Sequence, residues 1–127
     1  MTDEILDRIT GANQVKAWFG KWPAFHDAEI SAFRLDPGAV VTFKLYAWNM
    51  TSEVDENGYF RNEKYADVEF ILEGVSAVSI NDLSEVGILF ELEMEGEGTQ
   101  LKLTLNSSYG VNGTILFSKG LVSLKPR

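Results

Sequence analysis

The spacing of hydrophobic residues changes from a helical period to an alternating one near residue 29. Before that point, apolar residues at helical spacing, Ile9 among them, predict one or two short helices. The second helix is expected over 14–19, with Asn13 as its N-cap and Gly20 at its end. The chain is therefore expected to begin with a small helical part and to continue as a β domain.

From Glu29 onward, apolar and polar residues alternate as in half-buried β-strands. The expected strands cover 29–35, 40–48, 65–73, 75–80, 86–95, 101–106, 111–117 and 121–124. In the first of them, Ile30 and Phe33 are expected on opposite faces. The pattern predicts an α+β, mostly β fold: an antiparallel, meander-like sheet or sheets of about seven or eight strands behind the helices. Several strands are apolar on both faces, which predicts a second layer over the sheet.

Two hairpins are predicted from turn residues. Asn57-Gly58, inside the polar segment 49–64, is a strong hairpin-turn pair, so the flanking strands are expected to extend into that segment. Glu97-Gly98 is expected to be the two-residue loop of the second hairpin. The pairs across it would then be Met94–Leu101, Leu92–Leu103 and Phe90–Leu105 on one face and Glu93–Lys102 on the other.

Composition predicts one domain, 1–127, in a reducing compartment. A chain of 127 residues is long enough to bury a core without cross-links, and it contains no cysteine. The N-terminus is acidic where a signal peptide is basic, and no stretch approaches the ~20 apolar residues of a membrane span. We therefore expect a cytoplasmic protein that does not associate with membranes.

The charge balance favours a basic partner. The chain has 19 acidic and 11 basic residues and a formal net charge of −8. A nucleic-acid-binding protein needs a basic surface, so this class is excluded. Complementary fields accelerate association with a basic protein, although an acidic surface also serves solubility alone.

The most concentrated candidate chemistry lies in segment 22–29, which holds the single histidine of the chain. The residues of interest there are Trp22, Pro23, Phe25, His26, Asp27 and Glu29. Pro23 excludes Trp22 from helical geometry, so the segment is expected to be extended or turned. Three roles are open for its polar residues: metal ligation, general-base catalysis, and a structural role at a turn.

Each role makes a different demand on the geometry. A metal site needs three converging ligands, whereas Asp27 and Glu29 on a strand lie about 7 Å apart and face away from His26. A general base would be His26 oriented by Asp27, and it would need a nucleophile that no motif indicates. In the structural role, Trp22 and Phe25 anchor the junction between helix and sheet while the polar pair satisfies backbone groups at a bend. The structural role is favoured, with no metal and no cofactor.

Two further acidic segments are candidate partner-binding surfaces. Glu91, Glu93 and Glu95 share one face of a predicted strand, too far apart for one metal ion. They form either a solvated outer face or an acidic patch for a basic partner. The segment 53–61 is an acidic loop with two aromatic residues, which are typical interface anchors. Its candidate contacts are Asp55, Glu56, Tyr59 and Phe60.

The sequence Trp22-Pro23-Ala24-Phe25-His26-Asp27-Ala28-Glu29 resembles the signature of the immunity protein 50 family, which follows a short helix. The similarity covers most of the chain from about Trp18 and includes segments 71–75 and 108–110. Immunity proteins of this kind are thought to neutralise a toxin encoded beside them. The resemblance implies a cytoplasmic bacterial protein that binds a cognate toxin, and it names neither the toxin nor the contacting residues.

We therefore expect a non-enzymatic protein that neutralises a cognate, basic bacterial toxin by direct binding. One alternative is a small metal-dependent or histidine-based hydrolase centred on His26, Asp27 and Glu29. Another is an interaction domain with no toxin partner. An enzyme should hold these three residues in an open pocket, whereas a binding protein should pack the motif and expose an acidic or aromatic surface elsewhere.

Overall fold

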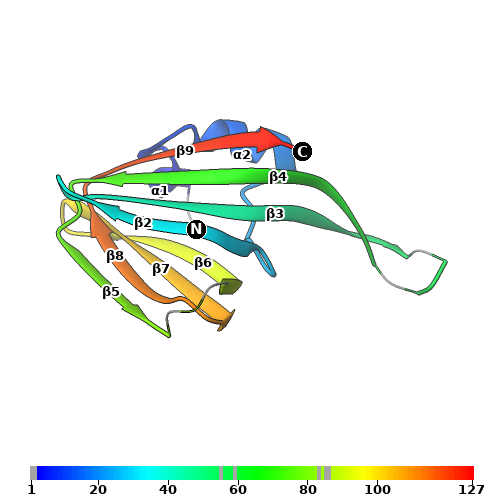
Figure 1. Ribbon diagram of the computed structural model, residues 1–127. Coiled ribbons are helices and arrows are strands. Elements are labelled where there is room, and N and C mark those ends of the chain that lie inside the picture. Colours follow the sequence, from blue (N-terminus) through cyan, green and yellow to red (C-terminus); the bar gives the residue numbers. More distant parts are fainter. Residues whose placement is uncertain (1–2, 55, 59, 83, 85–86) are drawn as a thin grey trace.

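The computed structural model describes residues 3–54, 56–58, 60–82, 84 and 87–127; for residues 3, 49–54 and 60–63 only the backbone is described. Two helices and nine strands form in these residues (Figure 1). The helices are α1 (Asp3–Leu6) and α2 (Ala12–Phe19). The strands are β1 (Ile9–Thr10), β2 (Glu29–Asp36), β3 (Val40–Val54), β4 (Phe60–Glu73), β5 (Ala77–Asn81), β6 (Gly87–Glu97), β7 (Gln100–Tyr109), β8 (Asn112–Phe117) and β9 (Lys119–Pro126).

The fold is mostly β, but its sheet is mixed. The described strands form one sheet in the order β1-β9-β4-β3-β2-β6-β7-β8-β5. β1 pairs with β9 in parallel and the other neighbours are antiparallel. The predicted α+β, mostly β class is confirmed, and every neighbouring pair except β1–β9 is antiparallel as expected. The prediction of a purely antiparallel meander is wrong, because β1 pairs in parallel and the strand order departs from the chain order at β9, β6 and β5. The ninth strand, β1, was missed because it has two residues and Ile9 also fits a helical pattern.

The two halves of the sheet cover each other's inner face. β2 and β6 pair only where Glu29 and Ile30 meet Ile88 and Gly87, and on either side of this short ladder the strands form two groups that converge at one end (Figure 1). The buried side chains of both groups belong to one core. The predicted second layer is thus the other half of the same sheet, together with the N-terminal segment.

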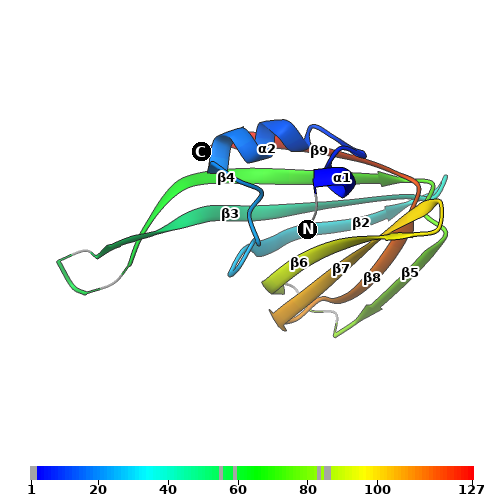
Figure 2. The same cartoon turned by 180° about the vertical axis from the view of Figure 1, so that it is seen from behind.

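Helix α2 lies over β9, beside β4, when the molecule is seen from behind (Figure 2). It begins after Gly11 and ends before Gly20, both with φ near +90° (91° and 87°), so the N-cap is Gly11 and not Asn13. A Cβ atom at Gly11 would lie 2.0 Å from the carbonyl oxygen of Val122. Glycine therefore allows the helix start to approach the β9 backbone closely. The expected end at Gly20 is confirmed.

A β-bulge in β2 changes which residues face the core. Ile30 pairs with Leu45 and Ala32 with Lys44, which leaves Ser31 as the extra residue. Because of the bulge, Ile30 and Phe33 both face the core, and Phe33 stacks on Phe43 with ring centroids 6.3 Å apart. The predicted opposite orientation of Ile30 and Phe33 is wrong for this reason.

The β6–β7 hairpin has the predicted faces for most of its length but not the predicted register. Its loop is Gly98-Thr99, and Gly98 has a φ of 63°. The pairs are Met94–Leu103, Leu92–Leu105, Glu93–Thr104 and Glu95–Lys102. A slip of two residues keeps every side chain on its own face, so alternation alone could not distinguish the two registers.

The strands β3 and β4 continue beyond the rest of the sheet as a two-stranded ribbon (Figures 1 and 2). We call residues 49–63 the β3–β4 arm. The turn at its tip contains Asn57-Gly58, with Gly58 at φ 85°. The prediction that strands extend into the polar segment is confirmed.

Candidate functional site

The aromatic residues of segment 22–29 are anchored in the core. After α2 ends, Pro23 keeps the chain out of helical geometry and Phe25 turns inward, where 3% of it is exposed. The Phe25 ring contacts those of Trp22, Phe19 and Phe70 edge-to-face, with centroid distances of 5.6, 6.4 and 6.0 Å. Phe25 holds this position with a φ of 60°, which is unusual for a bulky residue. Its burial therefore offsets a strained backbone.

The polar residues of the segment form the tip of a β-turn. The amide of Ala28 donates to the carbonyl of Phe25 (3.1 Å), and Asp27, third in the turn, has a φ of 66°. That conformation is one that aspartate tolerates better than most residues. The amide of Asp27 donates to the carbonyl of Leu89, and the amide of Leu89 donates to the carbonyl of Ala28. The turn is thus fastened to the start of β6.

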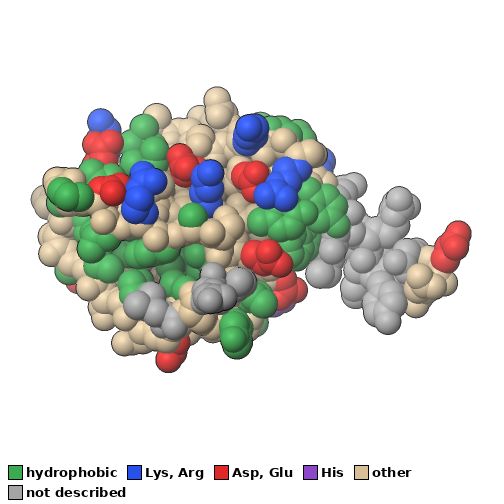
Figure 3. Space-filling model, in the orientation of Figure 1, with side chains coloured by type: hydrophobic (Ala, Val, Ile, Leu, Met, Phe, Trp, Pro, Cys, Tyr) green, Lys and Arg blue, Asp and Glu red, His purple; other side chains and the backbone are tan. Residues whose placement is uncertain are grey.

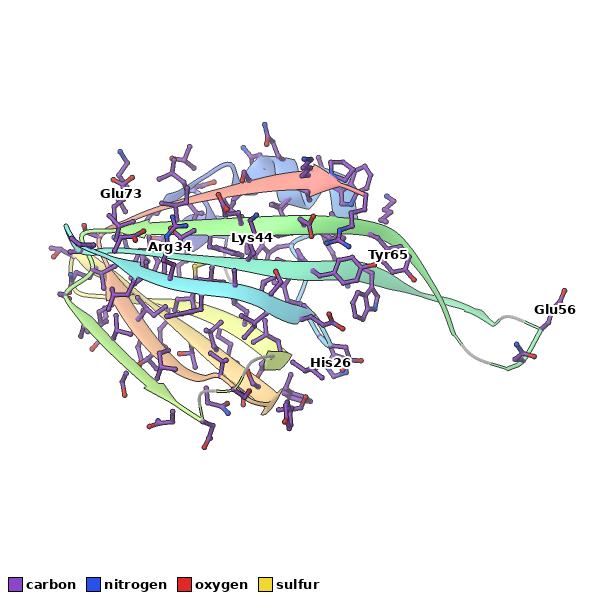
Figure 4. All side chains as sticks on the ribbon, viewed as in Figure 1. His26, Arg34, Lys44, Glu56, Tyr65 and Glu73 are labelled. Atoms are coloured by element: carbon purple, nitrogen blue, oxygen red, sulfur yellow. The ribbon has the colours of Figure 1, made fainter. Side chains whose placement is uncertain are left out.

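His26 points out from this turn beside β6 (Figure 4). Its Nδ1 lies 3.0 Å from the carbonyl oxygen of Phe90, so this nitrogen carries the proton and donates it. Its Nε2 lies 3.6 Å from Oδ2 of Asp27, and the two side chains are 55% and 47% exposed. The His26 ring also meets the ring of Phe90 edge-to-face at 5.4 Å. The pair is therefore fixed by a backbone carbonyl and an aromatic ring on β6.

Glu29 lies apart from this pair. It is the first residue of β2, it is exposed, and it pairs with Tyr46 on one side and Ile88 on the other. Within the described residues, no group of three or more His, Asp or Glu side chains is placed to hold a metal ion. His26, Asp27 and Glu29 are thus not placed to share one metal ion.

The fold brings the motif and the glutamate stripe together. A hollow of about 360 Å³ is lined by Trp22, Pro23, Ala24, Glu91, Leu92, Glu93, Met94, Glu95 and Thr104, and we call it the groove. Five consecutive residues of β6 line it, although side chains alternate between the two faces of a strand. The groove therefore runs along the edge of β6 that faces away from β7, opposite segment 22–24. His26, Asp27 and Glu29 are not among the residues that line it.

The groove is acidic along one side. Protonated Glu93 donates a hydrogen bond to the carboxylate of Glu91, and this bond, together with the negative charge of Glu91, raises the pKa of Glu93. The charge of Glu95 is partly neutralised, because Nζ of Lys102 lies 3.8 Å from its carboxylate. On the opposite side, the indole N–H of Trp22 is buried and has no hydrogen-bond partner in the described part of the chain. The groove thus combines carboxylates with an aromatic wall.

The second candidate segment forms the end of the β3–β4 arm. Glu56 is exposed at the tip, far from His26 (Figure 4). Asp55 and Tyr59 lie outside the described residues. Phe60 belongs to β4 by its backbone, and its side chain is not described. The arm and the groove are therefore separate surfaces.

Sequence reasoning missed two residues at the motif and the groove, Phe90 and Thr104. Phe90 was expected to face Leu105 in the core, but a bulge between Leu89 and Glu91 turns it outward, and it is 51% exposed. The adjacent apolar pair Leu89-Phe90, which interrupts the alternation of β6, was the available signal. Thr104 reaches the groove through its pairing with Glu93, which follows from the corrected register.

The face formed by β2, β3, β4 and β9 carries mixed charges rather than an acidic patch. Acidic and basic side chains lie side by side over it (Figure 3). Nζ of Lys44 is 4.0 Å from Glu69, and Nη2 of Arg127 is 2.9 Å from Asp67. This face therefore offers a basic partner less net negative charge than the groove does.

Comparison with known proteins gave no match: no family model, curated protein or solved structure matches the chain. In the described part of the chain, neither helix has the length and the apolar character that a membrane span requires.

Proposed function

We propose that this protein is an immunity protein that neutralises a cognate bacterial toxin in the cytoplasm by binding it directly. The groove is the observation that carries the proposal. Its row of glutamates beside the Trp22 wall suits a basic protein surface, because complementary charge steers association and fixes the orientation of the partners. The net charge of −8 acts in the same direction at longer range.

The arrangement of the motif also supports a binding role. Its aromatic residues stabilise the core and thereby place segment 22–24 opposite β6. The resemblance of Trp22–Glu29 to the immunity protein 50 signature supports the same conclusion. A stable complex would bury on the order of 1,200–2,000 Å², so the partner would extend well beyond the groove.

The test is co-expression with the product of the adjacent upstream gene, scoring growth rescue and co-purification together. Rescue with a stable complex is the expected result. Rescue without a complex would instead favour the hydrolase hypothesis, in which the toxin or its product is destroyed. If the protein neither rescues growth nor forms a complex, the proposal is wrong.

Matched charge variants make the test specific to the groove. Glu91→Gln/Glu93→Gln removes two charges from the groove, and Glu69→Gln/Glu73→Gln removes two from strand β4. The groove variant is expected to weaken the complex by about tenfold or more, and the control by much less. Equal losses would show that only net charge matters.

A further inference from the structure

The β3–β4 arm leaves the body without support from a neighbouring layer. Figures 1 and 2 show no other described element beside its outer part. A two-stranded ribbon is marginally stable alone in water. The direction of such a ribbon must be set where it joins the sheet, so the contacts at its base are informative.

A β-bulge lies at that junction. Ala47 pairs with Ala66 but Asn49 pairs with Glu63, so two residues of β4, Lys64 and Tyr65, lie opposite Trp48 alone. Lys64 has a φ of 56°, which bends the strand at this point. A bulge changes the direction of a strand between its two sides, and here one side is the arm and the other is the body of the sheet.

Helix α2 holds this bulge through two reciprocal hydrogen bonds. Nε1 of Trp18 donates to the carbonyl of Lys64 (3.1 Å), and Nζ of Lys64 donates to the carbonyl of Trp18 (3.0 Å). Each residue therefore contributes one side-chain donor and one backbone acceptor. We call this pair of bonds the clamp.

Aromatic side chains support the other face of the same junction. Tyr46, Trp48 and Tyr65 lie with ring centroids 5.5 to 6.1 Å apart, and the guanidinium of Arg127 lies 4.3 Å from the centre of the Tyr46 ring. Tyr65 lies where the arm leaves the sheet (Figure 4). The base of the arm is therefore held on both faces.

We infer that the β3–β4 arm is a preoriented docking element for a basic protein surface, directed by the clamp between Trp18 and Lys64. The role in docking rests on the proposed function; the role of the clamp in orienting the arm does not. Three of the four residues at 53–56 are acidic, and Glu56 is exposed at the tip. Fixing a binding element before association reduces the entropy that binding must overcome.

The clamp can be opened with substitutions that the positive φ at the bulge allows. Trp18→Phe removes the indole donor and keeps an aromatic ring. Lys64→Gly removes the ammonium and suits the positive φ. Lys125→Ala is the control, because it removes a lysine from the neighbouring strand β9 and leaves the clamp intact.

The orientation of the arm is measured on the free protein. Because the chain has no cysteine, spin labels at Glu56→Cys and Ser123→Cys report one distance, from the tip of the arm to the body. The single narrow distance of the parent protein should be retained with Lys125→Ala and lost in Trp18→Phe/Lys64→Gly. If the double variant keeps the narrow distance, the clamp does not orient the arm.

Docking is measured separately, as toxin affinity of the unlabelled variants. The double variant is expected to bind roughly tenfold more weakly than the parent, with the groove intact. A lost distance with unchanged affinity would overturn docking by the arm and leave the proposed function standing. If the parent protein binds no toxin, the proposed function and the docking role both fail. The distance measurement still shows whether the clamp orients the arm.

Discussion

The groove and the β3–β4 arm differ in how they are joined to the core. The groove combines segment 22–24 with β6 residues about 70 positions later, and two of its lining residues, Leu92 and Met94, are buried in the core. The arm is one continuous hairpin that meets the body only at its base (Figure 1). Substitutions at the groove should therefore alter stability and binding together, whereas substitutions at the arm tip should alter binding alone.

The largest expected effect separates the two surfaces by stability. Phe25→Ala removes the ring packed behind Trp22 and should cost about 3–5 kcal/mol of unfolding free energy, because the surrounding rings cannot fill the space. Glu56→Gln at the arm tip should leave the urea midpoint unchanged. Urea unfolding followed by tryptophan fluorescence measures both, and similar midpoints for the two variants would contradict the comparison.

The next effect concerns binding. This comparison combines the groove variant, Glu91→Gln/Glu93→Gln, with the clamp variant, Trp18→Phe/Lys64→Gly. Among the contacts of the described residues, none joins the two sites, so the effects of the variants on toxin affinity should add. Together they should weaken binding by roughly a hundredfold, since each pair contributes about tenfold. Calorimetric titration of the four proteins completes the cycle. A combined loss no larger than either single loss would show that the two surfaces are one site.

A smaller effect separates the contribution of the turn's backbone conformation to stability from that of the Asp27 carboxylate. Asp27→Val places a β-branched residue at a φ of 66° and should cost about 1–2 kcal/mol, whereas Asp27→Gly suits that backbone. Both variants lose the carboxylate beside His26, so their difference isolates the backbone. The measurement is the urea midpoint of each. Equal destabilisation would mean that the carboxylate, and not the turn conformation, is what the fold requires.

The smallest effect depends on pH. Glu91 raises the pKa of Glu93, so the folded state holds that proton more tightly than the unfolded state does. The stability from this group is complete below the ordinary glutamate value of 4.5 and is lost as pH rises through the raised pKa. Glu93→Gln should therefore melt at a higher temperature than the parent protein at pH 7. The difference should disappear near pH 4, and a difference that persists there would contradict this explanation.

Much of the fold followed from local pattern. Alternation located the eight longer strands, and Gly20 and Asn57-Gly58 marked the helix end and the arm turn correctly. The errors arose where one residue or a slip of two changes the pairing: the bulge at Ser31, the outward Phe90 and the shifted β6–β7 loop. Alternation has a period of two and does not distinguish registers that differ by two.

The candidate site was only partly visible in the sequence. The motif and the glutamate stripe were recognised separately, and the rings of Trp22 and Phe25 pack against each other and against Phe70. Their shared groove was not predicted, because it depends on segment 22–24 lying against the free edge of β6. The clamp was also missed, since nothing local links Trp18 to Lys64 across 46 positions.

The sequence by itself determined the class of the fold, the turn at Asn57-Gly58, the acidic composition and the residues that carry candidate chemistry. These properties depend on periodicity, turn preference and charge, which act over a few neighbouring residues. Only the tertiary structure decided the strand order and the direction of the arm. It also placed segment 22–24 and the glutamates of β6 around one groove, with His26 and Glu29 outside it. Each of these depends on backbone hydrogen bonds and packing between segments far apart in the chain, and a local pattern does not contain that information.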